Sequence, residues 1–104
     1  MSIEQILQNE IEDAKRWIEI EKDESTYKRD LKKRVELINW VLYIMKNSDV
    51  NISAIIESRM NKIIDKINTT YSILEAESLH SELRILDWIL YQVSSNEIKQ
   101  FERI

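Results

Sequence analysis

Apolar residues recur along the chain at the spacing of an α-helix in four stretches. Over residues 3–18 they stand three or four positions apart, which places them on one helix face: Ile3, Ile6, Leu7, Ile11, Ala14, Trp17 and Ile18. Similar stripes cover residues 26–45, 52–67 and 73–93. The pattern predicts four amphipathic helices.

Polar segments separate these stripes, and capping motifs stand at helix starts. The segments cover residues 22–26, 46–49 and 68–70. Ser2 and Ser72 each begin a Ser-x-x-Gln or Ser-x-x-Glu capping box. Asn51 is a residue type preferred at the N-cap of the third helix.

The third break and the C-terminal end are open to two interpretations each. Ile67, Tyr71 and Leu74 stay in phase with the third stripe, so one long helix over residues 52–93 is an alternative. The polar run Ser94–Asn96 predicts the end of the fourth helix. Beyond it, Ile98, Phe101 and Ile104 suit a short fifth helix or a frayed tail.

The second half of the chain repeats the first. A shift of 48 residues aligns Val35–Met45 with Leu83–Val93, including these pairs: Asn39 with Asp87, Trp40 with Trp88, Leu42 with Leu90 and Tyr43 with Tyr91. A shift of 49 residues aligns the first and third stripes. The repeated unit is therefore a helix pair, and a unit that cannot bury its apolar face alone needs a second one.

Composition supports an all-α fold. The 104 residues include no glycine or proline, 43% are hydrophobic and 33% are charged. We therefore predict one domain, an antiparallel four-helix bundle built from two homologous hairpins. The hairpins cover residues 2–46 and 51–94, followed by a tail over 95–104.

Targeting signals and membrane spans are not evident. The first residues lack the basic and apolar run of a signal peptide, and the longest apolar run, residues 37–45, is too short to cross a membrane. Without cysteine there is no disulfide. We expect a cytoplasmic protein with no membrane partner.

Charges are segregated along the first hairpin. The first helix ends in acidic residues, namely Glu19, Glu21, Asp23 and Glu24, and the second begins with basic ones, namely Lys28, Arg29, Lys32, Lys33 and Arg34. These groups either pair across the hairpin, or the basic cluster binds an anion, an acidic partner or nucleic acid. The net charge of −4 favours pairing.

Catalytic patterns are weak. His80 is the only histidine, and its Glu77-x-x-His80 spacing has no counterpart in the first half. A metal-dependent hydrolase would have to use Glu10, Asp13, Glu21 and Glu24, which lie on one helix or at its end. No glycine-rich loop is available to hold a phosphate. We expect no enzyme, no cofactor and no bound metal.

The second and fourth helices are apolar around almost their whole circumference near their tryptophans. Their surplus apolar face either completes the core or forms a protein interface, for which the candidates are Leu37, Trp40, Tyr43, Ile44, Ile85, Trp88 and Tyr91. We expect a homodimeric protein-binding module, an adaptor or inhibitor of the kind that phages and mobile elements commonly encode. A nucleic-acid-associated regulator using the basic cluster is the alternative.

Overall fold

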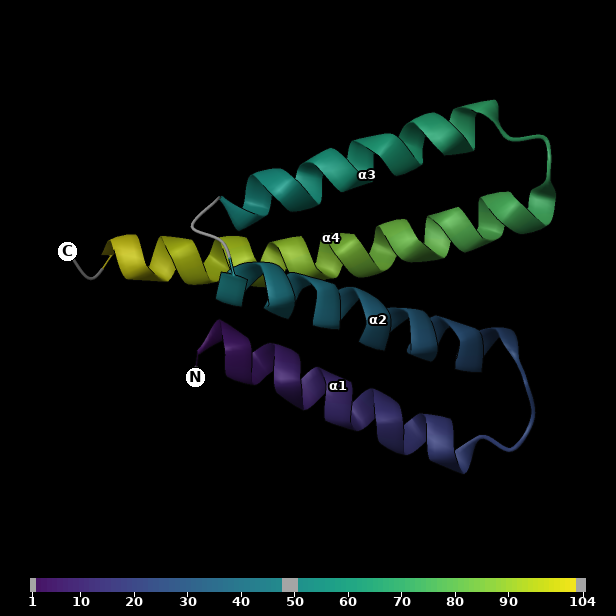
Figure 1. Ribbon diagram of the computed structural model, residues 1–104, viewed down its shortest axis with the longest axis horizontal. Coiled ribbons are helices and arrows are strands. Elements are labelled where there is room, and N and C mark those ends of the chain that lie inside the picture. The colour runs from purple at the N-terminus through teal and green to yellow at the C-terminus, as the bar shows by residue number, and fades with distance from the viewer. Residues whose placement is uncertain (1, 48–50, 103–104) are drawn as a thin grey trace. The chain divides into compact units, whose positions relative to one another are not determined.

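The computed structural model describes residues 2–47 and 51–102, with side chains described through Ser95. These residues form four helices: α1 (Ile3–Ile20), α2 (Thr26–Asn47), α3 (Ile52–Thr69) and α4 (Ile73–Glu102). Figure 1 shows them as two helical hairpins, in which α1 runs antiparallel to α2 and α3 antiparallel to α4. The predicted all-α class and the two hairpins are confirmed.

The chain divides into two compact units, Met1–Ser48 and Asp49–Ile104. Each unit contains one hairpin. Within the second unit, α4 is much longer than its partner, with 30 residues against 18 in α3. Its C-terminal turns therefore extend beyond the start of α3 (Figure 1).

A side-chain oxygen caps the N-terminus of each helix. The predicted caps Ser2, Asn51 and Ser72 accept hydrogen bonds at 3.1, 3.2 and 3.2 Å from the backbone N–H three residues later. Ser25 does the same for α2, accepting from the N–H of Lys28 at 3.1 Å. Such caps satisfy backbone donors that have no partner within the helix, and each contributes about 1 kcal/mol.

The break between α3 and α4 excludes the single long helix over residues 52–93. Thr70 has extended backbone angles, φ −82° and ψ 143°, and ends α3. Its hydroxyl accepts a hydrogen bond from the N–H of Ser72 and donates one to Glu75 Oε2 at 3.1 Å. These polar contacts hold the turn and outweigh the apolar periodicity that continues through it.

The predicted end of the fourth helix at Ser94–Asn96 is wrong. α4 continues to Glu102, so the described residues contain neither a separate fifth helix nor a frayed segment after Val93. Serine and asparagine lower helix stability by only about 0.5 kcal/mol each relative to alanine, and a helix already formed propagates easily. No described residue has a positive φ, the usual device for ending a helix sharply.

The two hairpins bury equivalent positions. Three pairs related by the repeat have no exposed side-chain surface: Leu7 and Ile56, Ile38 and Leu86, and Val41 and Ile89. Ala14 and Ile63 form a fourth buried pair. The internal repeat seen in the sequence is therefore also a repeat of the core.

None of the helices, as far as the described residues define them, is both long and apolar enough to cross a membrane.

Truncation of a core isoleucine is expected to be much more costly than truncation of a surface one. Ile56→Ala removes a side chain with no exposed area and should reduce the free energy of unfolding by roughly 2–5 kcal/mol. Ile64→Ala, on the same helix at 41% exposure, is the control and should cost less than half as much. Chemical denaturation measures both, and equal losses would contradict the assigned core.

Candidate functional site

The seven predicted interface residues differ widely in exposure. Leu37 and Ile85 are almost fully buried, at 0% and 4%. Trp40, Ile44 and Trp88 are half-buried. Tyr43 and Tyr91 are exposed, at 67% and 68%. Surface available to a partner is therefore concentrated on the tryptophans and tyrosines, while Leu37 and Ile85 contribute to the core.

The exposed aromatic residues occupy the same place in both hairpins. Tyr43 follows Trp40 by three positions on α2, and Tyr91 follows Trp88 by three on α4, so each pair forms neighbouring side chains on one helix surface. The residues before the tryptophans, Asn39 and Asp87, are both exposed. Each hairpin thus presents a Trp–Tyr pair beside a polar side chain. We call these the two Trp–Tyr pairs.

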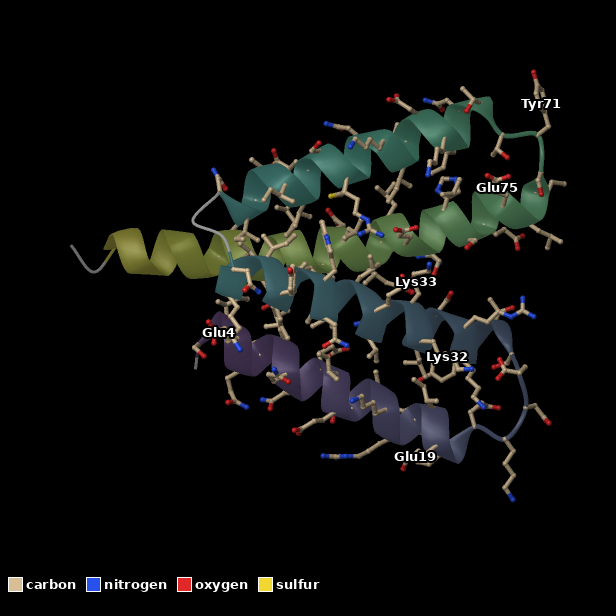
Figure 2. The ribbon with its side chains drawn as sticks, in the orientation of Figure 1. Glu4, Glu19, Lys32, Lys33, Tyr71 and Glu75 are labelled. Carbon is tan, nitrogen blue, oxygen red and sulfur yellow. The ribbon has the colours of Figure 1, made fainter. Side chains whose placement is uncertain are left out.

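Both hairpin turns also expose large apolar side chains that were not among the predicted interface residues. At the α1–α2 turn, Trp17, Ile20 and Tyr27 are 53%, 65% and 52% exposed. At the α3–α4 turn the corresponding residues are Tyr71, Ile73 and Leu74, at 103%, 77% and 78%. Figure 2 shows Tyr71 projecting away from the connection. Their position beside polar turn segments is the signal in the sequence that could have identified them.

The basic cluster of α2 is paired with acidic groups of its own hairpin. Glu24, in the turn, accepts a hydrogen bond from Lys32 at 3.0 Å and lies 3.7 Å from the ammonium of Lys28. Figure 2 shows Lys32 on α2 near the turn. Of the four predicted acidic residues, Glu24 is the partner, because the turn places its carboxylate over the first two turns of α2.

Two further members of the cluster have acidic neighbours outside the group of four acidic residues that was predicted to pair with it. Arg34 reaches Glu10 on α1 at 2.7 Å, and Lys33 lies 3.8 Å from Glu36. Arg29 is exposed and makes no ion pair within residues 2–47 and 51–95. Pairing with acidic groups of its own hairpin is therefore the interpretation of this cluster that the contacts favour. The Arg34–Glu10 pair joins α1 to α2, whereas Lys33–Glu36 lies within α2.

The carboxylates considered for a metal-dependent hydrolase do not converge. Glu10 contacts Arg34, Asp13 lies 3.7 Å from Arg16, and Glu24 contacts Lys32. Within the described part of the chain, no three His, Asp or Glu residues are grouped so that they could hold a metal ion. His80 and Glu77 are both exposed on α4.

Comparison of the chain with models of known protein families, with curated proteins and with solved structures finds no match.

The Glu24 contacts are expected to make the stability of the folded chain depend on pH in the acidic range. The hydrogen bond from Lys32 and its positive charge, with a smaller effect of Lys28, lower the pKa of Glu24 below its ordinary value of 4.5. A carboxylate whose pKa is lowered on folding stabilises the folded state above its unfolded pKa. That contribution is lost as the pH falls through the lowered folded pKa.

Glu24→Gln should therefore reduce the fall in melting temperature on acidification between roughly pH 5 and pH 3. The effect should be small, because Glu24 is fully exposed to solvent. Glu19→Gln is the matched control, since Glu19 is exposed and has no ion pair in the described ranges. Melting temperatures of the Glu24 variant and the wild type that fall identically on acidification would argue against a stabilising contact between Glu24 and the two lysines.

Proposed function

We propose that this chain is a non-catalytic protein-binding module that forms a homodimer and acts as an adaptor or inhibitor by covering a surface of another protein. The observation that carries the proposal is that each hairpin exposes a tyrosine to the same extent, beside a half-buried tryptophan, at equivalent positions of the repeat. Tyr43 and Tyr91 are 67% and 68% exposed, each beside a half-buried tryptophan.

The chemistry of these side chains suits an interface. Tryptophan and tyrosine contribute large apolar area with little loss of side-chain entropy, and they carry much of the binding energy in protein complexes. A half-buried tryptophan can pack into its own hairpin on one side and against a partner on the other. The exposed phenol can then hydrogen-bond across the interface or at its rim.

The distribution of charge supports a protein partner over nucleic acid. A phosphate-binding site needs lysine and arginine side chains whose interaction with phosphate is more favourable than their interaction with the acidic residues already beside them. Here Glu24 engages Lys28 and Lys32, and Glu10 engages Arg34. The chain also has a net charge of −4. The nucleic-acid alternative is therefore not the one we propose.

Self-association can be tested by light scattering on a sizing column over a dilution series. The wild type should run as a dimer that dissociates only at high dilution. The double variant Tyr43→Ser/Tyr91→Ser should raise the dimer dissociation constant at least about tenfold, equivalent to about 1.4 kcal/mol. Its melting temperature at dilutions where both proteins are monomeric should match that of the wild type, because both tyrosines are exposed.

Tyr71→Ser is the matched control. Tyr71 is more exposed than either tyrosine of the Trp–Tyr pairs, yet it lies in the α3–α4 turn, so its loss should leave association unchanged. A wild-type chain that stays monomeric at every concentration would contradict the homodimer. Equal weakening by all three serine substitutions would show that association is not specific to the Trp–Tyr pairs.

A further inference from the structure

Each hairpin contains an ion pair that joins its two helices. In the first, Arg34 Nη1 on α2 lies 2.7 Å from Glu10 Oε1 on α1. In the second, Arg59 Nη2 on α3 lies 2.8 Å from Glu82 Oε1 on α4. The four side chains are 14–32% exposed, so solvent screens these pairs less than it screens the open pairs around Glu24.

The two ion pairs occupy the same place in the repeat. Glu10 corresponds to Arg59 by the 49-residue offset, and Arg34 corresponds to Glu82 by the 48-residue offset. These are the offsets that align the apolar stripes. The same interhelical contact is therefore present in both hairpins with opposite polarity. The acidic residue lies on the first helix of the first hairpin and on the second helix of the second hairpin.

The exchange has a consequence for helix pairing. The apolar stripes of α1 and α3 resemble each other, as do those of α2 and α4, so apolar burial alone does not distinguish α1 packed on α2 from α1 packed on α4. Wrong pairing in the same register would place Glu10 opposite Glu82 and Arg59 opposite Arg34. Like charges that are partly shielded from solvent repel, and such repulsion excludes wrong partners.

We propose that the reversed ion pairs select the helix partners: they favour α1 with α2 and α3 with α4, and they oppose α1 with α4 and α3 with α2. The selection acts within one chain during folding and between two copies that come together. It does not depend on the proposed function, because it concerns how each hairpin is assembled rather than which surface it presents.

Charge exchange in the full-length chain provides a test that leaves composition and net charge unchanged. The variants Glu10→Arg/Arg59→Glu and Arg34→Glu/Glu82→Arg each place like charges at both native contacts and opposite charges at both wrong ones. The quadruple variant combines all four substitutions. It restores native attraction with the polarity of each pair reversed.

Each double variant is expected to lower the thermal unfolding midpoint by about 5–10 °C, and the quadruple variant to recover to within about 2 °C of the wild type. Methyl NOEs between α1 and α2 and between α3 and α4 should weaken in the doubles and return in the quadruple. The quadruple variant carries every substitution of both doubles. A recovered unfolding midpoint therefore cannot result from changed helix propensity at the individual positions. If the doubles do not fold at all, the quadruple still decides the question.

A fourth variant separates selection from simple attraction. Glu10→Arg/Arg34→Glu gives both hairpins the same polarity, so native and wrong pairings are equally attractive at these positions. It should keep a thermal unfolding midpoint near that of the wild type. Interhelical NOEs between methyl groups of α1 and α4 near residues 10 and 82 should be stronger than in the wild type.

Three results would overturn the proposal. The first is a quadruple variant no more stable than the doubles. The second is doubles that melt and pair like the wild type. The third is a Glu10→Arg/Arg34→Glu chain whose interhelical NOEs are the same as those of the wild type. The two ion pairs would then be attractive contacts that play no part in selecting the helix partners.

Discussion

The burial of one apolar stripe against another, between the two helices of each hairpin, is the interaction on which the rest of this structure depends. Leu7 and Ile38 in the first hairpin, and Ile56 and Leu86 in the second, have no exposed surface. In proteins most of the stability of an amphipathic helix comes from such packing rather than from the intrinsic helix preference of its residues. The caps, the ion pairs and the exposed aromatic residues all take their positions from this packing.

A chain without glycine or proline must change direction by other means, and this one uses side-chain oxygens. Ser2, Ser25, Asn51 and Ser72 each accept a hydrogen bond from a backbone donor at a helix start. Where such a competing acceptor is present, as at Ser72, the helix breaks even though the apolar phase continues. At Ser94–Asn96, by contrast, the helix continues through polar residues.

Periodicity predicted four helices, though not the C-terminal end of α4, because an amphipathic stripe reflects a single buried face. It was less informative about the surface. Around Trp40 the helix is apolar on nearly every side, and the pattern could not tell that Leu37 is buried while Tyr43 is exposed. That difference depends on how α2 is rotated against α1. The Glu10–Arg34 contact likewise depends on the register of two helices, joining residues 24 positions apart.

Duplication creates a problem that the polar residues are well placed to solve. Two hairpins with the same apolar stripes offer each helix more than one acceptable partner, and a second copy of the chain would double the number. Apolar burial stabilises native and wrong pairings alike, because it is proportional to area and has little direction. A single charged contact per hairpin can break this equivalence only if its polarity differs between the two hairpins. Glu10–Arg34 and Arg59–Glu82 differ in this way. The Trp–Tyr pairs, by contrast, are alike in both hairpins, as the proposed interface requires.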